Sequence, residues 1–427
     1  MHPKALLDHA TALVGQVLRL DHPADAVVSR YFREHRELGS RERATLTETV
    51  YTVLRRKPYY ELLARSGSGA RERRLAILAL AAPADFVQAA LKPQEKEWLA
   101  DCRQVSDEQL MPIHRHNLPN WLAGALEQQL GAERFRQLAD SLLQGAPLDL
   151  RVNTLKAKRA DVIQALTEQQ LQAEATRFSP WGVRLRGRPA LMHMDLFKDG
   201  AIEVQDEGSQ LLALLLDARR GEMVADFCAG AGGKTLALGA EMRNTGRLYA
   251  FDVSAHRLDK LKPRLARSGL SNVHPAAIAH ERDDRIKRLS GKIDRVLVDA
   301  PCSGLGTLRR NPDLKWRQSE QTVQEMTARQ SAILASAARL VKSGGRLVYA
   351  TCSMLPQENE HIAEAFSQAH PGFRPLNVVE LLAQRKVEQA EVLGSPGQGG
   401  IEAGRYLRLW PDLHDMDGFF AAVWQKD

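Results

Sequence analysis

Apolar residues in the first 145 positions recur at helical spacing. In the stretch SRERATLTETVYTVLRRK, for example, Leu46, Val50 and Val53 fall on one face of a helix. Stripes of the same kind predict helices near 71–81, 84–92, 120–130 and 133–144. We therefore expect an all-α module over residues 1–145.

The pattern changes after this region. An alternating apolar and polar run predicts a strand near 149–154, a helical stripe follows at 159–168, and short strands interrupted by proline and glycine come next. A small α+β domain of RRM-like type is expected over residues 146–200.

From residue 201 onward, short apolar runs alternate with helical patterns. Four of these runs end at or beside Asp226, Asp252, Asp299 and Cys352. Because this alternation is typical of a parallel sheet covered by helices, we expect a doubly wound, Rossmann-like α/β sheet over 201–427. The four strand ends would then lie at one edge of the sheet. Residues 383–404, which contain GSPGQGG, are expected to form a mobile loop.

Composition narrows the class of protein. A chain of 427 residues with 44% hydrophobic and 26% charged residues is typical of a folded protein with two or three domains. No apolar stretch is long enough to cross a membrane and no secretion signal is recognisable, so we expect a cytoplasmic protein, and we expect it to be a monomer. Four scattered cysteines without a C-x-x-C pair predict free thiols and no metal site.

The charge balance permits a polyanionic partner. The chain has 59 lysine and arginine residues against 52 aspartate and glutamate residues, a net charge of +7. Basic and aromatic residues alternate in LRRKPYY at 54–60 and in RRNPDLKWR at 309–317. Ordinary solvated surfaces also look like this, but we expect these stretches to contact the phosphates of a polyanionic partner.

The strongest local signal is VADFCAGAGGKTL at 224–236, where an apolar strand ends at a glycine-rich turn that opens a helix. Such a turn lets a ligand approach the backbone at the sheet edge. A phosphate-binding P-loop would need glycine where Cys228 stands, and a dinucleotide fingerprint would need glycine at Thr235. S-adenosylmethionine remains as the expected cofactor, with Asp252 placed to accept hydrogen bonds from both ribose hydroxyls.

Four motifs resemble one known family. The segments GAIEVQDEGSQLLA, DFCAGAGGKT, VDAPCSGLGTLRRNPDLKW and SGGRLVYATCSMLPQENE are similar to those of the RNA 5-methylcytosine methyltransferases of the NOL1/NOP2/Sun group, over residues 147–427. The helical region resembles the NusB-type module of bacterial 16S ribosomal RNA cytosine-5 methyltransferases. Two departures stand out. Ala231 replaces the family's proline, and no acidic residue for the adenine is evident except Asp283 or Asp284.

The resemblance implies transfer of a methyl group from S-adenosylmethionine to carbon 5 of a cytosine in RNA. The expected substrate is 16S ribosomal RNA. Transfer RNA as the substrate, or a catalytically weak RNA-binding assembly factor, are the alternatives. An amino-directed methyltransferase would carry an N-P-P-[YF] motif, which the sequence lacks.

Carbon 5 of cytosine is a poor nucleophile, so a thiolate must first add to carbon 6. Proline-cysteine is the nucleophile of DNA cytosine methyltransferases, so chemistry alone favours Cys302. The family resemblance instead assigns addition to Cys352 and release of the product to Cys302. Asp299 is expected to bind the base, and Lys234 to orient it and to lower the pKa of the attacking thiol. The expected cofactor-binding residues are Cys228, Ala229, Gly230, Ala231, Gly232, Gly233, Lys234, Asp252 and Asp299.

Overall fold

The computed structural model describes residues 1–106, 108, 110–397 and 401–427. The chain divides into two compact units. The first contains Met1–Gly145 and Thr307–Glu320, and the second contains Ala146–Gly306 and Gln321–Asp427. Among the helices described, none is long and apolar enough to cross a membrane.

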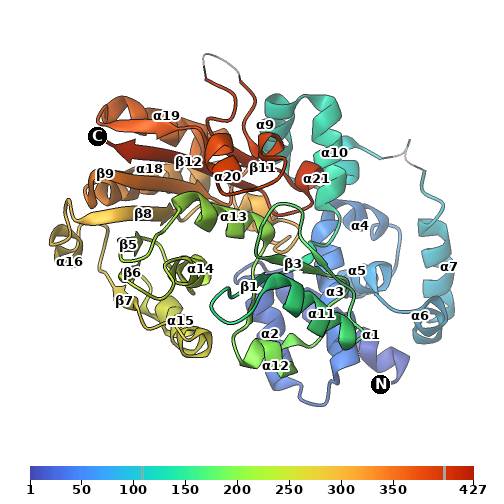
Figure 1. Ribbon diagram of the computed structural model, residues 1–427. Coiled ribbons are helices and arrows are strands. Elements are labelled where there is room, and N and C mark those ends of the chain that lie inside the picture. The colour runs from blue at the N-terminus through green and yellow to red at the C-terminus, as the bar shows by residue number, and fades with distance from the viewer. Residues whose placement is uncertain (107, 109, 398–400) are drawn as a thin grey trace. The chain divides into compact units, whose positions relative to one another are not determined.

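The first unit is helical, as its stripes predict (Figure 1). Leu46, Val50 and Val53 are all buried in its core, together with apolar residues of the first and fifth helices. Its helices are α1 (Pro3–Val17), α2 (Ala24–Glu34), α3 (Ser40–Arg55), α4 (Lys57–Leu63), α5 (Arg71–Ala79), α6 (Ala84–Ala90), α7 (Pro93–Cys102), α8 (Pro112–His116), α9 (Asn120–Leu130), α10 (Ala132–Leu142) and the short α17 (Leu314–Arg317).

The segment Thr307–Glu320 belongs to this helical unit, although it follows the PCSG loop in sequence. Lys315 Nζ donates to the carbonyl of Arg55 at 2.8 Å, and Trp316 Nε1 donates to the carbonyl of Leu54 at 2.8 Å. Arg309 Nη2 donates to the carbonyl of Gly145 at 2.9 Å. These bonds satisfy carbonyl groups where α3 and α10 end.

The prediction that 309–317 contacts the phosphates of a polyanionic partner is therefore wrong for two of its basic residues. Only 7% of Arg309 and 2% of Lys315 is exposed. Burial, together with the charge of the neighbouring Arg55, lowers the pKa of Lys315 to about 7. A sequence pattern cannot tell such a buried cation from a solvated one, because the carbonyl that it caps is distant in sequence.

The second unit begins with a four-stranded antiparallel sheet in the order β2-β3-β1-β4. Leu150 and Val152 of β1 and Val162 and Leu166 of α11 form its core. The elements are β1 (Leu148–Val152), α11 (Arg159–Glu168), β2 (Ala173–Ala175), β3 (Gly182–Leu185), η2 (Leu191–His193), α12 (Asp195–Lys198) and β4 (Ile202–Val204).

The large sheet follows the order β10-β12-β9-β8-β5-β6-β7, with β11 paired to β12. The five strands from β9 to β7 are mutually parallel, whereas β12 runs antiparallel to β9. The strands are β5 (Met223–Asp226), β6 (Arg247–Asp252), β7 (Val273–Ala277), β8 (Ile293–Asp299), β9 (Val341–Thr351), β10 (Phe373–Leu376), β11 (Leu407–Leu409) and β12 (Phe419–Lys426).

Alternate residues of these strands enter two separate cores, one on each face of the sheet. On β8, Leu297 joins one core and Val298 the other. The first core includes α13 (Glu207–Leu216), α14 (Gly233–Glu241) and α20 (Val378–Gln384), and the second includes α18 (Glu320–Ala338) and α19 (Glu360–Ala369). Helices thus cover both faces (Figure 1), and the predicted doubly wound α/β fold is confirmed.

The predicted strand ends are also found at one edge. Asp226, Asp252 and Asp299 are the last residues of three parallel strands, and Cys352 directly follows β9. The helix α15 (Ala255–Ser268) and the short helices α16 (Asp284–Lys287) and α21 (Pro411–His414) complete the connections.

The expected loop at 383–404 is partly built into the core. It contains the short helix η5 (Ala390–Leu393), in which Leu393 is fully buried. Residues 398–400 of this segment lie outside the described part of the chain.

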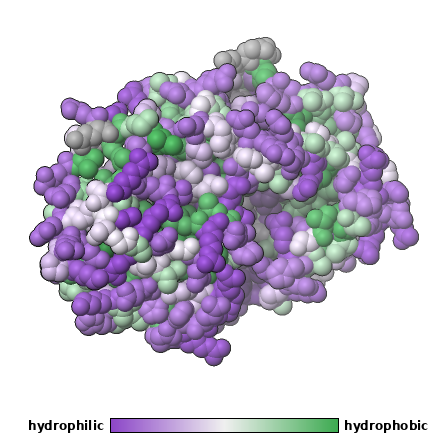
Figure 2. Space-filling model, turned by 180° about the vertical axis from the view of Figure 1, so that it is seen from behind, coloured by the Kyte–Doolittle hydropathy of each residue, from purple (hydrophilic) through white to green (hydrophobic). Residues whose placement is uncertain are grey.

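The surface is mainly hydrophilic on the face seen in Figure 2, with hydrophobic residues in separate patches. An exposed apolar residue lies at the edge of the large sheet where β5, β6 and β8 end. Val253, which directly follows Asp252, is 67% exposed.

Candidate active site

The glycine-rich turn between β5 and α14 adopts a backbone conformation that favours glycine. Gly230 and Gly232 have φ angles of +56° and +84°. A side chain at Gly232 would collide with Leu261. The turn is held in place because Arg264 Nη1 donates to the carbonyl of Ala231 at 2.7 Å. Ala231, which stands where the resembled family has proline, therefore lies in a turn that this hydrogen bond holds in place.

Asp252 connects this turn to the start of α15. Its Oδ2 accepts from the backbone N–H of Gly230 at 2.8 Å, and its Oδ1 accepts from that of Ser254 at 2.8 Å. Only 4% of Asp252 is exposed. A carboxylate oxygen can accept two hydrogen bonds, so each oxygen retains capacity for a ligand hydroxyl.

Asp226 lies fully inside the same edge of the sheet. Its Oδ2 accepts from Thr235 Oγ1 at 2.7 Å, while its Oδ1 is buried without a hydrogen-bond partner among the described residues. Burial raises the pKa of Asp226 to about 7. Such an orphaned acceptor is suited to a donor or a cationic group of a ligand.

The two acidic candidates after β7 have local partners. Asp283 caps α16, where its carboxylate accepts from the backbone N–H groups of Ala279 and Arg285. Asp284 forms an ion pair with Lys287 at 2.8 Å. Both carboxylates are thus engaged in the loop and helix that contain them.

Cys302 and Cys352 face each other from two adjacent loops. Their Sγ atoms lie 3.3 Å apart, and both residues are half-buried. Parallel pairing of β8 with β9 brings together these residues, which are 50 positions apart in sequence. The hydrogen bond with Cys352, followed by burial, raises the pKa of Cys302 well above that of an ordinary thiol.

Lys234 and Asp299 form an ion pair beside these cysteines. Lys234 Nζ lies 2.7 Å from Asp299 Oδ2, and the Lys234 side chain is 11% exposed. Burial is the largest single effect and would lower the pKa of Lys234, but the charge of Asp299, its hydrogen bond and the nearby Cys352 and Asp226 together outweigh burial, so the pKa is raised. An ionised Cys352 also stabilises this ammonium. The lysine is therefore a fixed positive charge close to the Cys352 sulfur.

A buried carboxylate behind the two cysteine loops was missed by reasoning from the sequence. Glu358, at the end of η4 (Pro356–Glu358), accepts hydrogen bonds from Ser303 and Ser353, the residues that follow the two cysteines. The serines were visible in the sequence as a repeated Cys-Ser pair. Their common partner could have been found only from the strand register.

The remaining cysteines lie outside this arrangement. Cys228 is half-buried in the glycine turn, and burial raises its pKa well above the ordinary value. Cys102 is buried in the helical unit. A separate group in that unit, His9, His35 and Glu37, places three possible metal-ligand atoms within 4.8 Å of one another.

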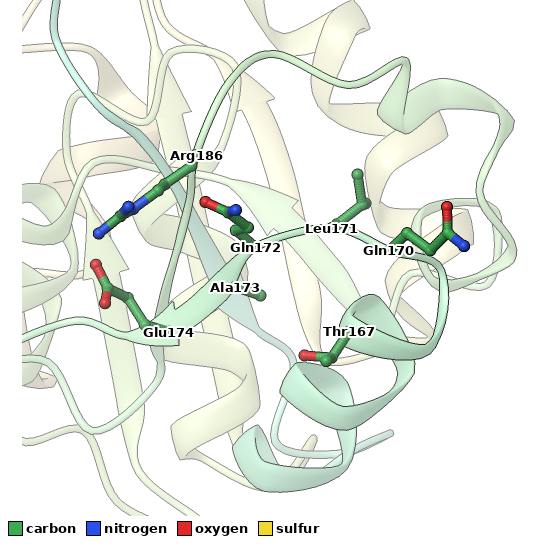
Figure 3. Close-up of a pocket in the computed structure, with 7 residues that line it drawn as sticks. All are labelled: Thr167, Gln170, Leu171, Gln172, Ala173, Glu174 and Arg186. Carbon is green, nitrogen blue, oxygen red and sulfur yellow. The ribbon is translucent and has the colours of Figure 1, made fainter.

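The second unit also has a surface pocket, and none of the predicted site residues lines it. It measures about 500 Å³ and opens at β2, the edge strand of the small sheet. Figure 3 shows the charged ends of Glu174 and Arg186 on the same side of it. Neither a cysteine nor a histidine lines this pocket, so we do not assign it a role in the chemistry.

The chain is similar over most of its length to known methyltransferases. The family described as 16S rRNA methyltransferase RsmB/F matches residues 213–425, and the RsmF/B-like ferredoxin-like domain matches residues 118–191. Ribosomal RNA small subunit methyltransferase B of Yersinia pseudotuberculosis is 30% identical, over 97% of this chain and 96% of its own length. The chain belongs to the 16S rRNA methyltransferase RsmB/F family. The resemblance recognised in the sequence is thereby confirmed.

Other members of the RsmB/F family and solved structures extend this agreement. A probable ribosomal RNA small subunit methyltransferase B of Synechocystis sp. is 36% identical, over 76% of this chain and 70% of its own length. The crystal structure of PH0851 is similar over 100% of this chain and 99% of its own, with a TM-score of 0.80 and 27% identity. The fold of PH0851 therefore matches this chain over both units.

Proposed function

We propose that this protein transfers a methyl group from S-adenosylmethionine to carbon 5 of a cytosine in 16S ribosomal RNA, through a covalent bond between Cys352 and carbon 6. The observation that carries the proposal is the pair of thiols. Two sulfur atoms 3.3 Å apart stand at the sheet edge where Lys234 and Asp299 also meet. A methyltransferase that alkylates an oxygen or an amino group has no need of two such thiols.

The residues of the glycine turn fit the expected cofactor. The positive φ angles of Gly230 and Gly232 shape the turn. Asp252 can accept from ribose hydroxyls, and the orphaned Asp226 oxygen can accept from an ammonium group. When bound, S-adenosylmethionine supplies an electrophilic methyl group. We assign Asp252 and the turn to holding it.

Addition is assigned to Cys352. Its sulfur forms a bond to carbon 6, and the electron pair of the C5–C6 double bond is then free to attack the methyl group from carbon 5. The family resemblance of the TCS segment is the reason for this choice, because the two thiols exchange one hydrogen bond and either sulfur can donate it. The Lys234 ammonium stabilises the Cys352 thiolate beside it.

Asp299 and Lys234 are assigned to the base. A carboxylate at the end of β8 can accept a hydrogen bond from the amino group of cytosine, or share a proton with its N3. Lys234 holds Asp299 in one orientation through their 2.7 Å contact. Together they stabilise the charge that develops on the ring when the thiolate adds.

Release is assigned to Cys302. Once Cys352 is bound to carbon 6 it no longer exchanges a hydrogen bond with Cys302, so the main cause of the raised pKa of Cys302 disappears. Cys302 can then lose its proton to solvent and accept the proton from carbon 5. The C6–S bond breaks, its electron pair returns to Cys352, and the methylated cytosine leaves.

The test combines purified protein, isotopically labelled S-adenosylmethionine and either 16S ribosomal RNA or transfer RNA. We expect label in the ribosomal RNA, located at a single cytosine by bisulfite sequencing, and no label with Cys352→Ala. Label on transfer RNA alone would overturn the assigned substrate. Label on any atom other than carbon 5 would overturn the assigned chemistry.

A further inference from the structure

Glu358 is a fully buried carboxylate with a complete set of donors. Its Oε1 accepts from the backbone N–H of Ser303 at 2.8 Å and from Gln330 Nε2 at 3.0 Å. Its Oε2 accepts from the hydroxyl groups of Ser303 and Ser353. Four donors match the four acceptor positions of an ionised carboxylate, which makes burial of this charge affordable.

The two serines are the residues that directly follow the two cysteines. Ser303 follows Cys302 in the loop after β8, and Ser353 follows Cys352 in the loop after β9. Their hydroxyl oxygens are also only 3.3 Å apart. The side chain of Glu358, in the short helix that follows the Cys352 loop, therefore joins the two cysteine loops.

The surrounding residues keep this carboxylate in place. Tyr349 in β9 donates its hydroxyl to the carbonyl of Glu358 at 2.6 Å. The neighbouring Asn359 donates to the carbonyl of Ser353 at 2.9 Å and accepts from Thr351. Glu358 cannot shift without breaking its bond to Tyr349 of β9, the strand that Cys352 directly follows.

From this geometry we infer that Glu358 is a positioning residue for the methyl transfer reaction. It fixes the distance between the attacking and the releasing sulfur because its Oε2 accepts from the hydroxyl groups of both serines, and its Oε1 also accepts from the backbone N–H of Ser303. It touches neither the base nor the cofactor and acts only through the two cysteine loops. The inference rests on the proposed roles of Cys352 and Cys302.

Removal of one serine hydroxyl at a time should change the amount of covalent intermediate in opposite directions. Ser353→Ala loosens the loop of the attacking sulfur, so addition slows by about tenfold and the covalent protein–RNA complex becomes scarcer. Ser303→Ala loosens the loop of the releasing sulfur, so release slows by a similar factor and the complex accumulates. A residue with a merely structural role would change both steps in the same direction.

The matched control is Ser336→Ala. Ser336 is also a buried serine with a hydroxyl hydrogen bond, to the carbonyl of Glu281, but it lies in α18 and has no contact with the cysteine loops in the described part of the chain. We expect this variant to lower thermal stability as the other two do, and to leave the fraction of covalent complex unchanged.

A second readout does not depend on RNA. The negative charge of Glu358 contributes to the raised pKa of Cys302, after the hydrogen bond to Cys352 and burial. Other titratable groups near the pair include Lys234, Asp299 and Tyr349. Glu358→Gln keeps the size of the side chain and removes the charge, so alkylation of Cys302 by iodoacetamide, followed site by site in the free protein, should begin at lower pH.

The experiment measures the covalent fraction on denaturing gels for wild type, the two serine variants and the control, together with the alkylation profile of Glu358→Gln. Opposite shifts for Ser303→Ala and Ser353→Ala, with an earlier alkylation of Cys302, support the inference. Equal shifts in one direction, or an unchanged alkylation profile, overturn it. If Cys302→Ala protein forms no complex either, the proposed function fails instead, and the alkylation profile still tests the role of Glu358.

Discussion

Replacement of Asp226 by asparagine should make the protein more stable at neutral pH. Asp226 is 1% exposed and stands near two further carboxylates, Asp252 and Asp299, both of which raise its pKa. Asparagine has the same shape and can still accept the hydrogen bond from Thr235. The substitution therefore removes a buried charge while the packing is retained.

The size of the effect follows from the pKa. Burial raises the pKa of Asp226 from 3.8 in the unfolded chain to about 7 in the folded protein. The folded protein binds the proton on Asp226 more tightly than the unfolded chain does. The contribution of Asp226 to the free energy of unfolding is therefore fully present below pH 3.8 and is lost as pH rises toward 7. The complete loss is about 4 kcal/mol, at about 1.4 kcal/mol for each pH unit.

Denaturant unfolding at several pH values between about 5 and 8 measures this contribution. The advantage of Asp226→Asn over wild type should grow by about 2 to 3 kcal/mol across that interval. Asp283→Asn is the matched control, because backbone hydrogen bonds from Ala279 and Arg285 lower the pKa of that exposed carboxylate, and it should gain no stability at high pH. An advantage that stays constant from pH 5 to pH 8 would show that Asp226 does not titrate as described.

Three further substitutions test the site. Asp299→Asn should slow methyl transfer in a single-turnover assay by about a hundredfold, because Lys234 loses its ionic partner; a rate close to that of wild type would contradict the role given to this pair. Asp252→Asn should weaken S-adenosylmethionine binding by about tenfold in a calorimetric titration, and unchanged affinity would exclude Asp252 from the cofactor site. Gly232→Ala should cost about 1 to 2 kcal/mol of unfolding free energy, since φ is +84° there and Leu261 must move; an unchanged melting temperature would refute this.

The sequence was most informative where the chain itself marks the ends of strands. The apolar runs that end at Asp226, Asp252 and Asp299 predicted both the parallel sheet and the edge at which the cysteines meet. The glycine turn could be predicted as well, because the left-handed backbone conformation at Gly230 and Gly232 favours glycine over other residue types.

Contacts between distant segments could not be predicted in the same way. Glu358 binds Ser303 across 55 positions, and the contact exists only because β8 and β9 pair in one register. Lys315 and Arg309 look like phosphate ligands in the sequence, yet they satisfy carbonyl groups of the helical unit. Hydrophobic periodicity carries no information about which buried acceptor a cation will meet.

In the proposed reaction Cys352 attacks the base and Cys302 releases it. The amount of covalent protein–RNA complex distinguishes these two roles. Protein, RNA and S-adenosylmethionine are incubated, denatured and separated on a gel that retains only covalent complexes. We expect Cys302→Ala to accumulate the complex, because release is blocked, and Cys352→Ala never to form it. A complex with Cys352→Ala and none with Cys302→Ala would show that the two roles are reversed, because the sulfur after the proline would then be the one that attacks.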